Sequence, residues 1–482
     1  MNGGQVMRAV WEQRVAKAVH MKIQGSIFAG FNTNVDVVVH LDKENVSDLI
    51  NSAGVSIEQV NQIDVSQVHS IQDKNQFVAV VKDCLGKGKS FYIVLDDLLL
   101  LDWLDQVFTH RKELMGGQAG IIANQMACLQ AKSIVYTSLL SPKQGAMFFP
   151  EVLYPVLNEQ LDLVPVQDAC RNEDSLKINW IFEYAKGEEF DFAGEKVVTP
   201  RANRVILATR PEGVVMGFDG EIAEHLPELG RKIDVAFLAG YHYAPTTQPE
   251  LDNYLAEILD DIRLLKQGNS NIRLHFEYVP MKDNKAEKRM LQTVAREIQS
   301  FGINENEIRR VLKAFGYQKE VDELKTNERA FALYKGALRV MDQLAFERIQ
   351  VHNLGYYVLV LKKPYVIEPS KVRDCCLYAS SVNAIKAKYG GYVASHQLPE
   401  VLDLGLSTIG YEQLEGFYNE AKSLGFDIPE NFCREGIWER EDHYVIVVPA
   451  HVVPHPVSTV GMGDTISSSS YASEFSGVCV EN

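Results

Sequence analysis

Thr459-Val-Gly461-Met462-Gly463-Asp464-Thr-Ile-Ser-Ser, near the C-terminal end of the 482-residue chain, carries the most information about its fold and chemistry. Because glycine has no Cβ atom, the amide N–H groups of Gly461, Met462 and Gly463 can converge on an anion. We expect a helix to begin at Asp464, since small residues follow as far as Ala472, and its positive N-terminus would face the same anion. Asp464 could then accept the proton of an attacking hydroxyl while these amides stabilise a phosphoryl group in transfer. A glycine-containing turn with Asp464 as an ordinary helix cap accounts for the motif about equally well.

A row of short polar side chains lies on the first expected strand, residues 26–41. Strand alternation places Asn32, Asn34 and Asp36 on one face. Such groups are costly to bury without partners, and sugar hydroxyls would supply both donors and acceptors. An Asx-rich strand end is an equally good interpretation.

A second glycine turn, Gly116-Gly117-Gln118-Ala-Gly120, precedes an apolar helix expected over residues 120–130. It resembles a turn whose backbone approaches a ligand closely. If the motif is considered without the rest of the sequence, an ordinary loop that starts a helix is the better interpretation.

Two carboxylates suggest a magnesium site. Alternation puts Arg273, His275 and Glu277 on one face of a strand, and Glu307 follows in Asn304-Glu-Asn-Glu307. Mg²⁺ is a hard cation that keeps several waters and needs only one or two carboxylates. Without other evidence, a simpler interpretation is favoured over a metal site: Glu277 forms an ion pair at the end of its strand, and Glu307 is a solvent-exposed helix residue.

Basic residues gather on two segments, residues 177–184 and 203–209, that we predict to pair as antiparallel strands. Lys177, Arg201 and Arg204 would form a local positive site over a cleft. A single strand-borne arginine is more often a surface residue.

The composition narrows the class of protein. A formal charge of −16 disfavours a general nucleic-acid surface, and every long apolar stretch is interrupted by charges, which disfavours a membrane span. Charged residues also interrupt the N-terminal pattern, so we expect no secretory leader. Seven cysteines without a CxxC motif predict reduced thiols and a cytoplasmic protein. We expect small-molecule ligands, no nucleic acid and no membrane, and a monomer or small homo-oligomer.

Strand-like and helix-like segments alternate along the chain, which predicts an α/β fold around a mostly parallel sheet. The expected strands are 26–41, 132–140, 235–239 and 272–279, and the expected helices are 72–84, 120–130, 251–266 and 287–302. The antiparallel pair lies between the early and later units, so we assign it to a small inserted domain that covers a cleft.

The order of the motifs resembles that of the ADP-dependent sugar kinases of the ribokinase superfamily, the archaeal-type phosphofructokinases and glucokinases. The matching stretches are Phe-Asn32-Thr-Asn34-Val-Asp36, Gly116-Gly-Gln-Ala-Gly120, Asn-Trp-Ile-Phe-Glu183-Tyr, Pro200-Arg-Ala-Asn-Arg204, Gly240-Tyr-His-Tyr, His275-Phe-Glu277, Asn304-Glu-Asn-Glu307, His352-Asn-Leu-Gly-Tyr-Tyr and Val460-Gly-Met-Gly-Asp464. They cover nearly the whole chain.

The resemblance implies a ribokinase-like three-layer α/β/α large domain (1–36, 115–174 and 212–482) with a smaller α/β lid (37–114 and 175–211). It also implies roles for individual residues. Asp464 would be the catalytic base, the anion hole would be formed by Gly461, Met462 and Gly463, and Mg²⁺ would be held by Glu277, Glu307 and Asp464. The substrate would be bound by Asn32, Asn34, Asp36, Gly117, Gln118, Lys177, Arg201 and Arg204. The nucleotide would be bound by His352, Tyr357 and Val448.

The implied reaction is transfer of the β-phosphate of MgADP to a sugar, leaving AMP. Glucokinases of the family carry a glutamate in the lid that binds a glucose hydroxyl, just before the helix that here starts near Gln72. Residues 65–72 of this chain contain no acidic residue, which disfavours glucose as the substrate. Lys177 and Arg204 resemble the cations that the family's phosphofructokinases direct at the 6-phosphate. The sequence therefore predicts an ADP-dependent phosphofructokinase of glycolysis, forming fructose 1,6-bisphosphate.

Several alternatives remain open. One is an ADP-dependent glucokinase or bifunctional enzyme, and another is a sugar-phosphate sensor without turnover. An ATP-dependent kinase of ribokinase type is also possible. A zinc site built from His242, His275 and His352 carries little weight, because no HxxxH pattern or cysteine accompanies them.

Overall fold

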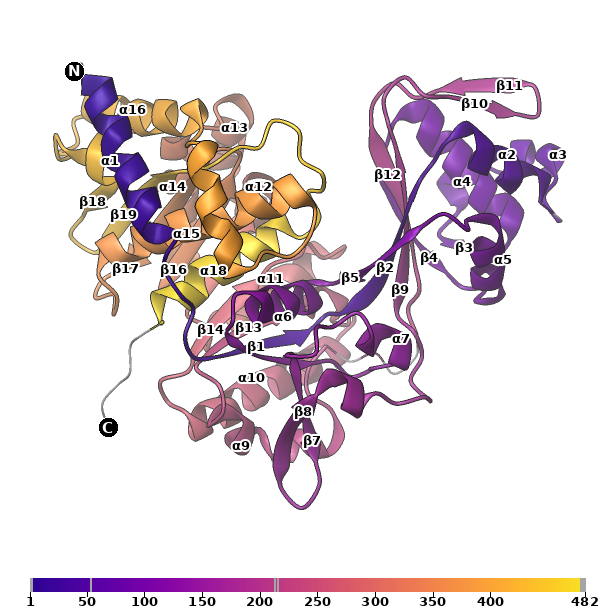
Figure 1. Ribbon diagram of the computed structural model, residues 1–482, viewed down its shortest axis with the longest axis horizontal. Coiled ribbons are helices and arrows are strands. Elements are labelled where there is room, and N and C mark those ends of the chain that lie inside the picture. Colours follow the sequence, from indigo (N-terminus) through magenta and orange to yellow (C-terminus); the bar gives the residue numbers. More distant parts are fainter. Residues whose placement is uncertain (1–2, 53, 212–213, 215, 477–482) are drawn as a thin grey trace.

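Two β-sheets divide the chain into a large lobe and a small lobe, as a computed structural model shows (Figure 1). The structure describes residues 3–52, 54–211, 214 and 216–476. Within these residues, every helix is too short or too polar to span a bilayer.

The large sheet has eleven strands in the order β18-β19-β17-β16-β15-β14-β13-β1-β6-β7-β8. Their bounds are β1 (Ser26–Phe31), β6 (Lys132–Tyr136), β7 (Leu153–Leu157), β8 (Leu161–Pro165), β13 (Val235–Ala239), β14 (Arg273–Glu277), β15 (Ser300–Asn304), β16 (Arg348–Asn353), β17 (Tyr356–Lys362), β18 (Ile437–Glu439) and β19 (His443–Pro449). The central strands from β16 to β7 are parallel and both margins are antiparallel. The carboxyl ends of the parallel strands therefore meet along one edge, where α/β proteins bind ligands.

Helices surround the large sheet (Figure 1). They are α1 (Gly3–Ala18), α6 (Gln118–Cys128), α7 (Pro142–Gly145), α8 (Gly220–Glu224), α9 (Leu226–Gly230), α10 (Glu250–Gly268), α11 (Asn284–Val294), α12 (Glu305–Ala314), α13 (Gln318–Thr326), α14 (Ala330–Gln343), α15 (Pro369–Tyr389), α16 (Thr408–Ser423), α17 (Phe432–Glu435) and α18 (Met462–Glu474). Short 3₁₀ turns also occur at Val166–Ala169, Tyr241–Tyr243 and Ser395–Asp403. Helix α18 packs closely on α15 and also contacts α6, so it is held inside the lobe rather than on its surface.

The small sheet has six strands in the order β3-β4-β12-β9-β2-β5. Their bounds are β2 (Asn34–His40), β3 (Ser70–Ile71), β4 (Phe91–Leu95), β5 (Lys112–Gly116), β9 (Ile178–Tyr184) and β12 (Asn203–Ala208), and a hairpin of β10 (Glu189–Phe192) and β11 (Glu195–Val198) extends from them. The small lobe also contains α2 (Lys43–Asn51), α3 (Ile57–Gln62), α4 (Lys74–Lys87), α5 (Leu99–Val107) and a 3₁₀ turn at Val65–Gln67.

One face of the small sheet forms a separate core. Val35, Val37, Trp180 and Phe182 pack there with α2, α4 and α5. The opposite face carries Asp36 and, in register with it, Asn179 of β9. The small lobe is thus a sheet with one helix-covered face and one polar face.

The α/β fold class and the antiparallel pairing of β9 with β12 are confirmed. Three expected elements were wrong in extent, and one of them, the expected strand 132–140, ends at Tyr136. The expected strand 26–41 breaks at Asn32 and Thr33, because the chain crosses there from the large sheet to the small one. The expected helix 287–302 ends at Val294, and the buried run that follows becomes β15.

The predicted domain boundaries at 36/37 and 114/115 fall inside β2 and β5, so hydrogen bonding places each strand whole in the small sheet. The predicted boundary at 174/175 lies in the segment before β9, and the one at 211/212 lies at the edge of the described residues. The assignment of the small lobe as a moving lid stays a prediction.

Candidate active site

The N-terminus of α18 forms the glycine turn that the sequence indicated. The helix begins at Met462, two residues earlier than expected, and Gly461 precedes it with a left-handed φ of 66°. A Cβ atom on Gly463 would lie 3.1 Å from Nε2 of His352. The turn therefore depends on glycine for its conformation at 461 and for its close approach to β16 at 463.

Three carboxyl groups interact at this edge of the large sheet. Burial first, and then the charge of Glu277, raise the pKa of Asp464 to about 8. Burial likewise raises the pKa of Glu277 to about 8. The pKa of Glu307 is raised to about 8 by burial first and then by the charges of Glu277 and Asp464. Like charges held together in this way fit a site that receives a cation.

Glu277 is fixed by neighbours on two elements. Its Oε2 lies 3.0 Å from Nε2 of His275. Ser467, on α18, lies beside Glu277 and lowers the pKa of its carboxyl group. Gly302 makes the approach possible, because a Cβ atom there would lie 2.8 Å from His275 Nε2 and 3.0 Å from Glu277 Oε2. Residues of β14 and of α18 therefore surround this carboxylate together.

The polar residues around the β1–β2 crossing form two neighbouring hydrogen-bonded sets. Asn32 donates to Oε1 of Gln118 at 2.5 Å, and Asn34 donates to Oδ1 of Asp36 at 2.5 Å. Asn179 donates to the same Asp36 oxygen at 3.1 Å. Burial raises the pKa of Asp36 to about 6, while these amide donors favour its charged form. The predicted sugar-binding residues are thus brought together.

The glycine turn at 116–117 lets β5 and α6 close onto this group. A Cβ atom on Gly116 would lie 2.2 Å from Nδ2 of Asn34, and one on Gly117 would lie 2.3 Å from the carbonyl oxygen of Asn32. Gly117 also has a φ of 75°. The close-approach interpretation of this motif fits the geometry better than a plain loop.

The predicted cations are only partly brought together. Lys177 is buried, donates to Oδ1 of Asn32, and lies 4.4 Å from the ring centroid of Tyr243. Arg204 is exposed, and its charge lowers the pKa of Asp36. Arg201 instead donates to the carbonyl of Gly88, at the C-terminal end of α4, at 2.5 Å.

The residues predicted to border the nucleotide lie side by side on adjacent strands. His352 of β16 pairs with Tyr357 of β17, which pairs in turn with Val448 of β19. Nδ1 of His352 has no hydrogen-bond partner among the described residues. Tyr357 and Val448 are almost fully buried, so in this conformation they support the wall behind His352.

Comparison with known proteins agrees with this geometry. Residues 25–473 match the model of the ADP-specific phosphofructokinase/glucokinase conserved region. The chain belongs to this family. It is 31% identical over 452 residues to the ADP-specific phosphofructokinase of Pyrococcus abyssi, covering 92% of this chain and 96% of that one.

Two solved structures are similar over nearly the full length. The last common ancestor of ADP-dependent phosphofructokinases from Methanosarcinales superimposes with a TM-score of 0.85 at 32% identity, covering 97% of this chain and 99% of that one. An ADP-dependent kinase complex with fructose-6-phosphate and ADPβS gives a TM-score of 0.82 at 29% identity and covers 100% of both chains.

Sequence reasoning missed two charged members of this kinase-family site. Arg210 lies 5.2 Å from the Tyr243 ring centroid and its charge lowers the pKa of Lys177. The alternation of side chains that places Arg204 and Ala208 on one face of β12 continues to Arg210, so this residue could have been predicted. Lys386 of α15 is buried, lies 4.8 Å from the ring centroid of Tyr392, and interacts electrostatically with Asp464. No sequence pattern indicated Lys386, because a single lysine inside a helix is usually a surface residue.

The arrangement of acids suits an indirectly held metal. Among the described residues, no three His, Cys, Asp or Glu side chains converge closely enough to enclose an ion by themselves. Mg²⁺ keeps several waters and takes part of its shell from substrate phosphates. Glu277, Glu307 and Asp464 fit that mode of binding.

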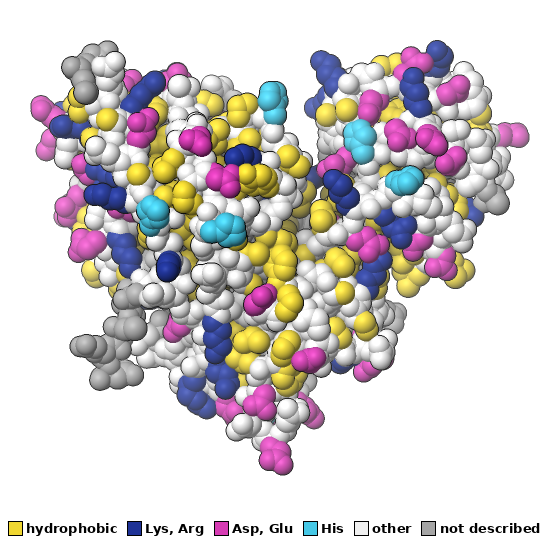
Figure 2. Space-filling model, in the orientation of Figure 1, with side chains coloured by type: hydrophobic (Ala, Val, Ile, Leu, Met, Phe, Trp, Pro, Cys, Tyr) yellow, Lys and Arg dark blue, Asp and Glu magenta, His cyan; other side chains and the backbone are white. Residues whose placement is uncertain are grey.

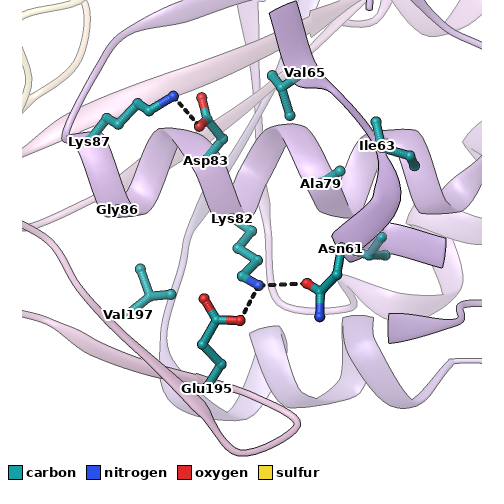
Figure 3. Close-up of a pocket in the computed structure, with 11 residues that line it drawn as sticks. Asn61, Ile63, Val65, Ala79, Lys82, Asp83, Gly86, Lys87, Glu195 and Val197 are labelled. Atoms are coloured by element: carbon teal, nitrogen blue, oxygen red, sulfur yellow. Dashed lines mark hydrogen bonds and ion pairs between the residues drawn. The ribbon is translucent and has the colours of Figure 1, made fainter. Parts of the chain in front are cut away.

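The small lobe also has a hollow of about 310 Å³ on its helix-covered side, between α4 and β11 (Figure 3). Lys82 points into it and donates to Asn61 at 2.7 Å and to Glu195 at 2.6 Å. Because Glu195 neutralises this lysine, the hollow lacks the unpaired cation that a sugar phosphate needs. The lobe's polar face remains the better substrate surface.

Proposed function

We propose that the protein transfers the β-phosphate of MgADP to fructose 6-phosphate, forming fructose 1,6-bisphosphate and AMP in the cytoplasm. The observation that supports this most is the combination at one sheet edge of the α18 glycine turn, the Asp464 carboxyl group and the coupled Glu277 and Glu307. A relative of similar structure is described as a complex with fructose-6-phosphate and ADPβS.

In this mechanism, the amides of Asn34 and Asn179 and the carboxylate of Asp36 orient the sugar. Asp464 takes the proton of the attacking sugar hydroxyl. The amides of the Gly461–Gly463 turn, at the positive end of α18, stabilise the charge on the phosphoryl group as it moves. Positioning and electrostatics supply most of the catalysis in reactions of this class.

Glu277, Glu307 and Asp464 would hold Mg²⁺ and its waters. Mg²⁺, when bound, neutralises charge on the ADP phosphates and favours the leaving of AMP. His275 lies 3.0 Å from Glu277 and orients its carboxyl group, and Ser467 favours the charged form against the burial that raises its pKa to about 8.

The choice of sugar rests on Lys177. Its buried ammonium group has Asn32 as a neutral partner and no ion pair among the described residues. A phosphate group supplies the missing negative charge, whereas glucose does not. This favours fructose 6-phosphate over glucose, which a glucokinase or bifunctional enzyme would accept.

AMP formation tests the proposal. Purified protein is incubated with MgADP and either fructose 6-phosphate or glucose, with MgATP as a control donor. We expect AMP only with MgADP and fructose 6-phosphate, and a loss of at least about 10²-fold in Asp464→Asn. Glucose-dependent AMP would favour the glucokinase alternative, and binding without turnover would favour a sensor.

A further inference from the structure

A buried chain of hydrogen bonds links the far end of α18 to Glu277. Glu474, the last residue of α18, accepts from Nε of Arg348 at 2.9 Å and from Nη2 at 2.6 Å. Nη1 of Arg348 donates to Oγ of Ser300 at 3.2 Å. Oγ of Ser300 lies 2.8 Å from Nδ1 of His275, whose Nε2 faces Glu277.

The donors and acceptors along this chain run in one direction when Glu277 is ionised, because a carboxylate only accepts and Nε2 of His275 must then carry the proton. Arginine has only donors, so Ser300 Oγ accepts from Arg348. The single hydroxyl proton of Ser300 is then free to be donated to Nδ1 of His275. With Nδ1 as acceptor, the neutral imidazole carries its proton on Nε2, which donates to the carboxylate of Glu277. Arg348 and Ser300 together therefore favour the histidine tautomer that supports an ionised Glu277.

Stability alone is a weak reason for this arrangement. The side chains of Arg348 and Glu474 are fully buried, and a buried ion pair often contributes no more than apolar residues of similar volume. Nη2 of Arg348 also donates to Ser470, four residues before Glu474 on α18, at 2.9 Å. The guanidinium thus fixes the position of the helix that carries Asp464 while it orients His275.

We propose that Arg348, with Ser300, is a positioning residue that couples α18 to Glu277 through the tautomer of His275. This inference rests on the proposed function in assigning Glu277 to Mg²⁺. Ser300→Ala removes the link and leaves the Arg348–Glu474 pair in place. We expect it to raise the Mg²⁺ concentration for half-maximal activity by about tenfold, as loss of outer-shell partners commonly does, with an unchanged KM for fructose 6-phosphate.

The tautomer gives a second readout that needs no turnover. In ¹⁵N-histidine NMR spectra, assigned by a His275→Gln protein, wild-type His275 should show an unprotonated Nδ1. Ser300→Ala should shift the proton towards Nδ1. Arg348→Lys should do the same, because an ammonium group cannot keep the planar fork of contacts to Ser300, Ser470 and Glu474.

Ser381→Ala is the matched control. Ser381 is a buried serine that donates only to the carbonyl of Leu377 on its own helix, at 2.9 Å, so its loss should leave both readouts unchanged. An unaltered tautomer in Ser300→Ala, or a Mg²⁺ requirement no different from that of Ser381→Ala, would overturn the proposal. If no substrate turns over, the proposed function fails, and the NMR result alone still decides the role of Arg348.

Discussion

Asp464, Glu277 and Glu307 share one property at the scale of single residues: each has a pKa raised to about 8, chiefly by burial. Between the usual carboxyl pKa and 8, the folded protein binds more protons than the unfolded chain, so these groups lower stability as pH rises through that window. A divalent cation relieves the repulsion between the charged forms.

We therefore predict that Mg²⁺ stabilises the protein more at about pH 8 than at about pH 6, with the rise in Tm larger by roughly 2 °C. Thermal unfolding with and without Mg²⁺ measures this. Glu277→Gln removes one of the three charges and should reduce the difference. Equal shifts in Tm at both pH values would contradict the assigned metal site.

Lys177 gives the second residue-scale prediction. Burial, with the charge of Arg210, lowers its pKa to about 7, so its ammonium form is present below that pH and lost above it. If Lys177 binds the sugar phosphate, the KM for fructose 6-phosphate should rise above about pH 7, by up to about tenfold per pH unit.

Steady-state kinetics between about pH 6 and pH 9 test this, with the KM for ADP as internal control. Lys177→Arg stays charged throughout and should flatten the profile. If the wild-type KM for fructose 6-phosphate does not change with pH, Lys177 does not bind the sugar phosphate.

At the scale of elements, the turn between β5 and α6 should be sensitive to one added methyl group. In Gly117→Ala, the Cβ atom would lie 2.3 Å from the Asn32 carbonyl oxygen, so the turn must move away from the sugar-binding group. We predict a loss of kcat/KM of about 10²-fold or more, because small displacements of positioning groups have effects of that size.

Gly187→Ala is its control. Gly187 also has a left-handed φ, of 83°, but nothing lies within 4 Å of its added Cβ atom. Gly187→Ala should cost about 1 kcal/mol of stability through backbone strain, and Gly117→Ala should cost more because its Cβ also meets the Asn32 carbonyl, while only Gly117→Ala should lose activity. Similar activity in the two variants would mean that the turn does not position substrate.

Local sequence patterns predicted elements well where a segment belongs to one sheet. The β9–β12 pair, the helix after Gly117 and the glycine turn before α18 all followed from alternation and glycine placement. The break at Asn32 did not, because a polar, half-buried run looks the same whether it stays in one sheet or crosses to another. Glu287–Gly302 was misjudged because the buried residues of β15 continue the apolar pattern of α11.

The site was predictable in composition but not in its supporting contacts. Asp36, Glu277 and Asp464 stand in motifs, and Arg210 continues the alternation of β12, whereas Lys386 reaches the site through tertiary packing that no local pattern encodes. Arg201 shows the opposite error: it lies close to Arg204 in sequence, yet its contact is with Gly88. Two residues that are close in sequence at the end of a strand can therefore direct their long side chains to different partners.

At the scale of the whole molecule, the polar face of the small sheet lacks a covering layer. Tyr92 and Leu114 are 40% and 41% exposed, and an open groove separates the small lobe from the large one (Figure 2). A surface that carries Asp36 and Arg204 beside exposed apolar groups is suited to close on a ligand, which would exclude water from phosphoryl transfer.

We predict that fructose 6-phosphate together with MgAMP, which cannot react, reduces the radius of gyration in small-angle X-ray scattering. If the sugar phosphate bridges Lys177 and Arg204 to the large lobe, as proposed, MgAMP alone should produce a smaller change. Arg204→Ala weakens that bridge and should leave the scattering curve close to that of the free protein at the same ligand concentration, while Arg201→Ala, whose contact lies at Gly88, should behave as wild type. Identical curves with and without both ligands, under conditions where calorimetry shows that they bind, would mean that the two lobes are rigidly joined and that the small lobe is not a lid.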